Sequence, residues 1–451
     1  MMPKIFFRRT LIACLSVAFF YQANNAAALG LLQAYDAALQ NDPTYRSAIF
    51  ENQAGQENRA LGRSNLLPNA QLNYSAGKNK SELTQPNFFG VLTTSHPEYT
   101  SSSGSVSVRQ TLFNLDAYAR YKQGNAQADY SDAVFSTKRQ DLVLRLFGAY
   151  ADAQYAEDQL TLLTAQRDAF EEQRLVNKKM FEKGEGTKTD MLETQAKLDL
   201  AEAQVLEAQD NLATSRNTLA AIIGQEVSQL DGLTDTFKVL PLSPSTFDEW
   251  KAIATVTNAE MIAGQYSLEA SEQEVKKAWA GHTPRLDLQA AYSRSKSDTL
   301  TTLNQEYATK SIGVQLVIPI YSGGSVSAAT SQAVANREKA RSDLETTTKK
   351  VMVELRKQYS AVLSSTTKID ALVKSVNSAT ELVQATKQSV KGGVRINLDV
   401  LNAQQQLVQA KRDLAQARYN YLVAYLRLRN AAGILSGDDL RTVSGFFVAG
   451  N

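Results

Sequence analysis

Residues that could do chemistry are few in this chain, and they lie far apart in the sequence. Its two histidines are His96, just before Pro97, and His282, two residues ahead of Pro284; its single cysteine is Cys14. A metal centre or a Cys/His nucleophile needs several such groups together, so we predict neither. The chain also lacks a GxxxxGKS/T loop and a GxGxxG after a strand, so we expect no nucleotide, no other cofactor and no enzymatic activity.

Charged residues beside two glycine-containing turns are the remaining candidates. Asp190 follows the turn at Gly184, and Asp399 follows the turn at Gly393, so that both pairs are 209 positions apart. A carboxylate in that place stabilises the start of a helix by capping it or by interacting with its dipole. Arg395, taken alone, is typical of a solvated surface charge. On spacing alone these residues have ordinary structural explanations.

The charge balance excludes a nucleic-acid partner. The chain has 451 residues with 48 basic and 46 acidic side chains. Three of the basic ones, Lys4, Arg8 and Arg9, fall in a segment that we expect to be removed, which leaves 45 against 46. A nucleic-acid-binding surface needs a basic excess, and none is present.

Residues 1–28 have the pattern of a secretory signal peptide. A basic start is followed by an apolar stretch and by small residues ending at Ala28, where we expect cleavage. A lipid-attachment signal ending at Cys14 is the alternative, but the apolar run continues to Phe20, so the part before the cysteine is too short. Cleavage after Ala28 would remove Cys14, so the mature chain would contain no cysteine. No later stretch approaches the ~18 apolar residues of a membrane-spanning helix, so any spanning segment must be a strand.

Two long tracts without proline predict unusually long helices. No proline lies between positions 97 and 241, and none follows 319; the tract 325–391 contains neither proline nor glycine. At ~1.5 Å per residue this tract would form a helix of about 100 Å, which is typical of a coiled coil. Apolar residues repeat every seven positions, as a coiled-coil seam requires: Met191, Leu198, Val205, Leu212 and Leu219, then Leu401, Val408, Ala415 and Leu422.

Four short segments change to an alternating pattern and predict two β-hairpins, at about 69–113 and about 285–321. Polar loops at roughly 79–103 and 295–309 would join their strands. Such alternation is typical of a half-buried soluble sheet, or of barrel strands with apolar side chains outward and polar side chains inward.

The two halves of the chain match each other. FEKGEGTKTDMLETQAKL (181–198) aligns with VKGGVRINLDVLNAQQQL (390–407). We therefore predict a first repeat at 29–240, a second repeat at 241–436 and a C-terminal tail at 437–451. The order of elements in each repeat would be helix, hairpin, long helix, turn and helix.

The two predicted hairpins supply four strands per chain. Four strands cannot close a barrel, and an open edge inside a bilayer leaves backbone groups unsatisfied. Two copies (eight strands) or three (twelve) could close one.

Several segments resemble the TolC family of outer-membrane efflux and secretion channels: GHTPRLDL (281–288), LVIPIYSGG (316–324), GGVRINLDVL (392–401) and QARYNYL (416–422). The resemblance implies an α+β membrane protein that closes as a homotrimer. An antiparallel transmembrane β-barrel would lie in outer-membrane lipid, and a long α-helical coiled-coil barrel would extend into the periplasm of a Gram-negative bacterium. The implied partners are a periplasmic adaptor (membrane fusion) protein, an inner-membrane ABC or other transporter, and the exported substrate.

The resemblance also assigns roles to residues near the turns. Arg395 corresponds to an arginine that bonds Asp190 and Thr189 and holds the periplasmic aperture closed. Asp399 corresponds to a residue of a cation-selective ring. Two positions depart from the family pattern. Asn402 stands where a second ring aspartate is expected, and Val390 stands where a latch tyrosine is expected.

These points predict a channel-tunnel with a gated aperture that conducts exported substrates across the periplasm and outer membrane without chemistry. Type I protein secretion is favoured because a lipid anchor is absent. The alternatives are the outer-membrane component of multidrug efflux and, less favoured, a periplasmic coiled-coil adaptor. The identity of the substrate is not predicted.

Overall fold

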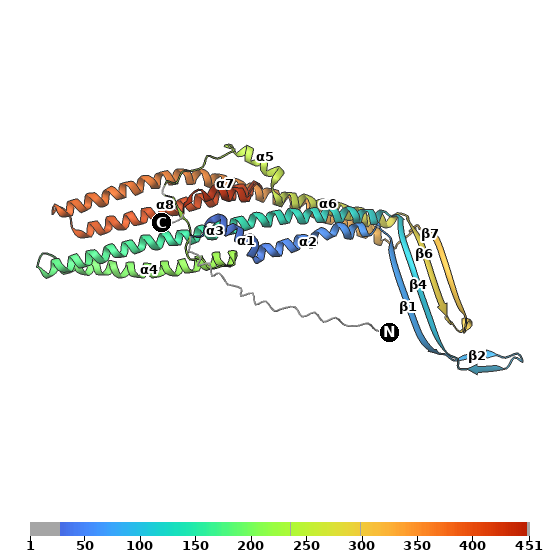
Figure 1. Cartoon of the computed structure of the whole chain (residues 1–451). Coiled ribbons are helices and arrows are strands. Elements are labelled where there is room, and N and C mark those ends of the chain that lie inside the picture. The colour runs from blue at the N-terminus through green and yellow to red at the C-terminus, as the bar shows by residue number, and fades with distance from the viewer. Residues whose placement is uncertain (1–27, 235, 298, 449–451) are drawn as a thin grey trace, which may run out of the picture.

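A computed structural model of the chain describes residues 28–234, 236–297 and 299–448. The predicted signal peptide therefore lies outside the described residues, apart from Ala28. The molecule is elongated, with a sheet at one end and two pairs of long helices that run to the other (Figure 1). Both element types predicted from the sequence, long helices and antiparallel hairpins, are present.

The same order of elements occurs twice along the chain. The first half contains α1 (Leu31–Asn41), α2 (Pro43–Ser64), β1 (Asn69–Lys80), β2 (Leu83–Pro86), β3 (Leu92–Ser95), β4 (Glu98–Phe113), α3 (Leu115–Glu182), α4 (Lys188–Ile223) and β5 (Gly232–Leu233). The second half contains α5 (Phe247–Thr257), α6 (Ala259–Trp279), η1 (Ala280–His282), β6 (Arg285–Lys296), η2 (Leu300–Thr302), β7 (Glu306–Val317), α7 (Ser325–Lys391), α8 (Asn397–Ala431), α9 (Gly437–Ser444) and β8 (Phe447–Val448).

The long helices α3 and α7 have 68 and 67 residues, and each is about 100 Å long. Helix α7 coincides with the tract that lacks proline and glycine. Helix α3 begins where the Asn114 side chain accepts hydrogen bonds from the backbone N–H groups of Asp116 and Ala117, at 2.9 and 3.4 Å. Helices α4 and α8 return along α3 and α7 (Figure 1).

The predicted seams are largely buried. In α4 the structure buries Leu198, Val205, Leu212 and Leu219, and leaves Met191 half-buried. Helix α8 packs on α3 as well as on α7, so its buried face is broader than one heptad stripe. Its buried residues include Val400, Leu401, Leu414 and Leu422, whereas Val408 and Ala415 are only half-buried.

The sheet has four strands in the order β1-β4-β6-β7, all antiparallel. Strands β4 and β6 join the two halves of the chain, with Val106 opposite Tyr292. Strands β1 and β7 form the two edges. The loop between β1 and β4 is less polar than predicted, because it contains the β2–β3 hairpin with Phe88 and Phe89 almost fully exposed at its tip.

A compact core lies midway along the helices, where the short elements gather. Trp250 of α5, Tyr150 of α3 and Tyr421 of α8 are fully buried in it. The indole N–H of Trp250 donates to the Pro244 carbonyl at 2.7 Å, so its polar atom is satisfied. Residues 437–448 of the predicted tail are part of this core, since β8 pairs with β5.

Candidate aperture at the helix tips

The two tip turns have the same geometry. Gly184 and Gly393 adopt left-handed conformations, with φ of 76° and 73°. After Gly184, the Glu185 N–H donates to the Met180 carbonyl at 2.9 Å, and 209 positions later the Val394 N–H donates to the Ser389 carbonyl at 2.9 Å. A residue with a Cβ is strained at such a φ, so glycine ends both long helices here. The backbone of the turn therefore leads into the next helix with the same geometry in both repeats.

Asp190 is engaged as a helix cap. Its carboxylate accepts a 2.7 Å hydrogen bond from the Thr187 hydroxyl, and the Asp190 N–H donates back to that hydroxyl at 3.1 Å. This is a capping box at the start of α4. Thr189, next to it, is exposed. The interpretation of Asp190 as a capping residue is therefore correct within one chain. Only one of its two carboxylate oxygens, Oδ2, accepts the hydrogen bond from Thr187.

Asp399 occupies the equivalent position in α8, but the cap is missing. The counterpart of Thr187 is Ile396, which has no hydroxyl to donate. Among the described residues, the half-buried carboxylate of Asp399 has no side-chain partner. The positive end of the α8 dipole stabilises its charge. The two aspartates occupy equivalent positions but differ in their contacts: the Asp190 carboxylate has a side-chain partner, and that of Asp399 has none within the described chain.

Arg395 is exposed in the second turn, where its backbone N–H donates to the Ser389 carbonyl at 3.3 Å. Within the described chain, no ion pair or side-chain hydrogen bond joins Arg395 to Asp190 or Thr189. A single protomer does not bring these residues together, so the latch stays a prediction for contact between chains. Asn402, which stands where the family pattern has a second ring aspartate, accepts a 2.8 Å hydrogen bond from the Lys197 ammonium group of α4.

A buried polar cluster that the sequence analysis missed joins the two helix pairs near the tips. The Asn177 amide of α3 donates to the Thr194 hydroxyl of α4 at 2.7 Å, and both residues are at least 95% buried. The Asn177 oxygen accepts from Gln173 at 3.0 Å and from Asn397 of α8 at 3.2 Å. Asn397 lies 220 positions from Asn177. This cluster therefore links the first repeat to the second.

One sequence signal could have indicated part of that cluster. Thr194 occupies a seam position, because the buried residues of α4 run Thr194, Leu198, Ala201, Val205 at alternating spacings of four and three. A polar residue in such a seam needs a buried partner. Beside the cluster, Leu401 of α8 packs into an apolar group with Phe170, Leu198 and Ala201.

The sheet at the far end separates apolar from polar side chains. Residues that pair directly across strands lie on the same face, and successive residues alternate between faces. One face carries apolar side chains that include Leu72, Tyr74, Val106, Val108, Tyr292 and Ile312. The other carries hydroxyl and amide side chains that include Gln71, Asn73, Ser105, Ser107, Ser293 and Ser311. Leu72 and Ile312 are 75% and 78% exposed, so no described segment of the chain covers the apolar face at these residues.

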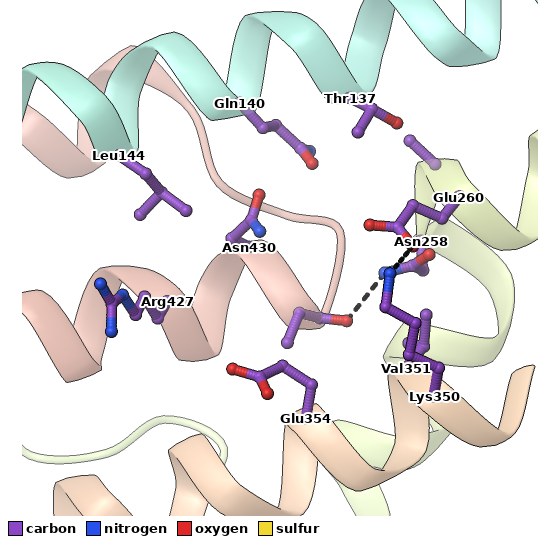
Figure 2. Close-up of a pocket in the computed structure, with 12 residues that line it drawn as sticks. Thr137, Gln140, Leu144, Asn258, Glu260, Lys350, Val351, Glu354, Arg427 and Asn430 are labelled. Atoms are coloured by element: carbon purple, nitrogen blue, oxygen red, sulfur yellow. Dashed lines mark hydrogen bonds and ion pairs between the residues drawn. The ribbon is translucent and has the colours of Figure 1, made fainter. Parts of the chain in front are cut away.

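The middle of the molecule holds a cavity of about 200 Å³ between α3, α6, α7 and α8 (Figure 2). Its lining contains two acidic groups, Glu260 and Glu354, and two basic groups, Lys350 and Arg427; the Lys350 ammonium group is 3.7 Å from the Glu260 carboxylate. The Asn258 amide beside it donates to the Ala431 carbonyl at 3.0 Å. The charges balance, so this cavity offers no preference for a charged ligand.

Further along α3, the half-buried Asp158 accepts a 2.8 Å hydrogen bond from the Tyr419 hydroxyl of α8. Burial raises the pKa of Asp158 above its ordinary value, and the hydrogen bonds from Tyr419 and Gln154 partly offset this.

In the described part of the chain, no cluster of three or more His, Cys, Asp or Glu is placed to hold a metal ion. Nor does any described helix have the length and apolarity to cross a membrane.

Long helix pairs with linked polar tips, joined to a sheet with one apolar and one polar face, favour a component of a membrane channel. Comparison with known proteins agrees. The family model described as "Outer membrane efflux protein" matches residues 34–225 and 252–434. The alkaline protease secretion protein AprF of Pseudomonas aeruginosa is 41% identical over 428 residues, covering 94% of this chain and 89% of the relative. The proteases secretion protein PrtF of Dickeya chrysanthemi is 36% identical, covering 96% and 94%.

Solved structures show the same fold at lower identity. The outer-membrane channel OprN has a TM-score of 0.76 at 19% identity, covering 89% of both chains. The outer membrane protein VceC of Vibrio cholerae also has a TM-score of 0.76, at 18% identity, covering 89% of this chain and 96% of VceC. This chain belongs to the outer membrane efflux protein family. It is a channel protein of the Gram-negative outer membrane that extends into the periplasm.

Proposed function

We propose that this chain is the outer-membrane duct of a type I protein secretion system and that its substrate is a secreted protease. AprF and PrtF, which are protease secretion proteins by name and match over nearly the whole chain, support this assignment. A periplasmic adaptor and an inner-membrane ABC transporter would dock at the helix tips. The duct conducts without chemistry, and its energy comes from the transporter.

The observation that carries the channel proposal is the open, two-faced sheet. Strands β1 and β7 are free edges of 12 residues each, and one face is apolar and exposed. Inside a bilayer each unpaired backbone group is costly, so further copies must pair with both edges. Three copies give a twelve-stranded barrel with the apolar face toward lipid and the hydroxyl and amide face toward the lumen. The choice of three over two rests on family resemblance.

At the opposite end, we propose that Arg395 of one chain bonds Asp190 and Thr189 of a neighbouring chain and so closes the aperture. One oxygen of Asp190 is used by its cap, and a carboxylate can accept further bonds. Three copies of Asp399 would form a ring around the axis. Because Asp399 lacks the cap of Asp190, its charge is available to attract cations.

Mass measurement of the purified protein in detergent tests the assembly. We expect three times the mass of the mature chain and recovery in the outer-membrane fraction. A stable monomer or dimer would contradict the barrel, and a soluble periplasmic location would favour the adaptor alternative.

Deletion of the gene and complementation test the substrate. Loss of extracellular protease with unchanged drug susceptibility is expected. The reverse result would indicate multidrug efflux.

A further inference from the structure

The charged residues of the sheet differ in which face they lie on and in how far along the strands they lie from the helices. On the polar face, Arg109 pairs with the buried Asp287 at 2.6 Å, close to the helices. The other charge there is Arg285, at the start of β6. All the remaining charged residues of the four strands lie on the apolar face, and they gather toward its far end, away from the helices.

This far end of the apolar face has a basic excess. It carries five basic residues and two acidic ones: Lys78, Lys80, Arg294, Lys296, Lys310, Glu98 and Glu306. Lys80 pairs with Glu98 at 2.8 Å, and Arg294 pairs with Glu306. The other three, Lys78, Lys296 and Lys310, are exposed and have no ion-pair partner among the described residues. We call these three residues the lysine rim.

A tyrosine precedes two of the three rim lysines on their own strands: Tyr74 lies between Leu72 and Lys78 on β1, and Tyr292 lies between Ala290 and Lys296 on β6. Tyr74 and Tyr292 are 74% and 43% exposed, and Lys310 lies directly opposite Tyr292 across the β6–β7 pair. Tyrosine prefers the boundary between hydrocarbon and water, and a lysine stem can extend along an apolar surface while its ammonium group reaches that boundary. The rim thus lies where lipid headgroups begin.

We propose that the lysine rim binds the phosphate groups of the phosphorylated glycolipid of the outer leaflet. The inference rests on the proposed function, because it requires the sheet to be in the outer membrane with its apolar face toward lipid. The outer leaflet is the one concerned, since the helices extend from the opposite end of the strands (Figure 1). Three ammonium groups that have no ion-pair partner within the described residues complement a lipid that carries more than one phosphate.

Position on the sheet adds to the argument. Lys78 lies on edge strand β1 and Lys310 on edge strand β7, whereas Lys296 lies on the inner strand β6. When neighbouring copies pair edge to edge, β1 of one copy lies beside β7 of the next, so Lys78 and Lys310 lie on the two strands of the same subunit junction. A lipid bound there would contact both subunits, so it would stabilise the assembly as well as anchor it.

The test uses the purified full-length protein in detergent and two probes, the bisphosphorylated glycolipid and its dephosphorylated form. Lys78, Lys296 and Lys310 are changed together to Gln. A matched control changes Lys178, Lys368 and Lys374, three exposed lysines of the long helices, to Gln. Bound lipid is counted by native mass spectrometry, and the shift in the thermal midpoint of the trimer is measured at low and high salt.

We expect the bisphosphorylated lipid to bind wild type and control alike, and to bind the rim variant on the order of 10- to 100-fold more weakly at low salt. High salt and dephosphorylation should each reduce binding to the wild type. Equal binding of both lipids, or unchanged binding to the rim variant, overturns the proposal. A protein that is not trimeric or not in the outer membrane would instead contradict the proposed function, and the mass and fractionation measurements detect that separately.

Discussion

Replacing Asn397 with alanine tests whether the buried polar cluster holds α8 against the first helix pair. The substitution removes the 3.2 Å hydrogen bond from the Asn397 amide to the Asn177 oxygen. That oxygen keeps its other donor, Gln173 at 3.0 Å, so no buried acceptor is left unsatisfied. The substitution also removes a weak 3.8 Å contact from the Asn397 amide to the Met180 sulfur. The cost is then mainly that of one net hydrogen bond, about 1 kcal/mol per chain.

Three chains would lose about 3 kcal/mol if all three contacts break when the aperture opens. This free energy changes the ratio of closed to open states on the order of 100-fold. We expect a higher open probability and a larger mean conductance than in the wild type. Asn177→Ala should have a larger effect, because it also removes the buried bond to Thr194.

Single-channel recording in planar bilayers is the assay. Asn336→Ala is the matched control, since Asn336 is exposed on α7 and makes no side-chain hydrogen bond within the described chain. If Asn397→Ala conducts like this control while trimer mass and thermal stability stay normal, the cluster does not restrain the tips. The gate would then depend on contacts between chains alone.

Three further changes test the remaining assignments. Arg395→Ser should raise conductance, because serine has neither the charge nor the reach of the guanidinium group; unchanged conductance in a folded trimer would count against the latch. Asp399→Asn should reduce cation selectivity and block by a trivalent cation in bilayer recordings; if both persist, Asp399 serves only the α8 dipole. Asp158→Asn should raise thermal stability at neutral pH and have little effect in acid. The raised pKa of Asp158 means that the folded state binds this proton more tightly, so wild-type stability falls as pH rises above the ordinary aspartate range. Midpoints that differ equally at pH 4 and pH 7 would contradict this.

The sequence by itself determined the local elements. A tract without proline or glycine predicts the 67 residues of α7 from first to last residue, because nothing in it interrupts the helical hydrogen bonds. Alternating side chains predicted the strands, since a strand with one apolar face has period two. The duplicated turns at Gly184 and Gly393 were also evident, because a left-handed residue after a helix favours glycine.

Only the tertiary structure decided what the tip residues contact. Asn397 of α8 bonds Asn177 of α3, 220 positions away in the sequence, and nothing local to either residue specifies that partner. Asn402 stands where the family resemblance expects an acidic side chain, and in the structure its amide oxygen accepts a hydrogen bond from Lys197, 205 positions away. Such contacts depend on how the two helix pairs lie against each other. That placement is set by packing along their whole length, which no local sequence pattern specifies.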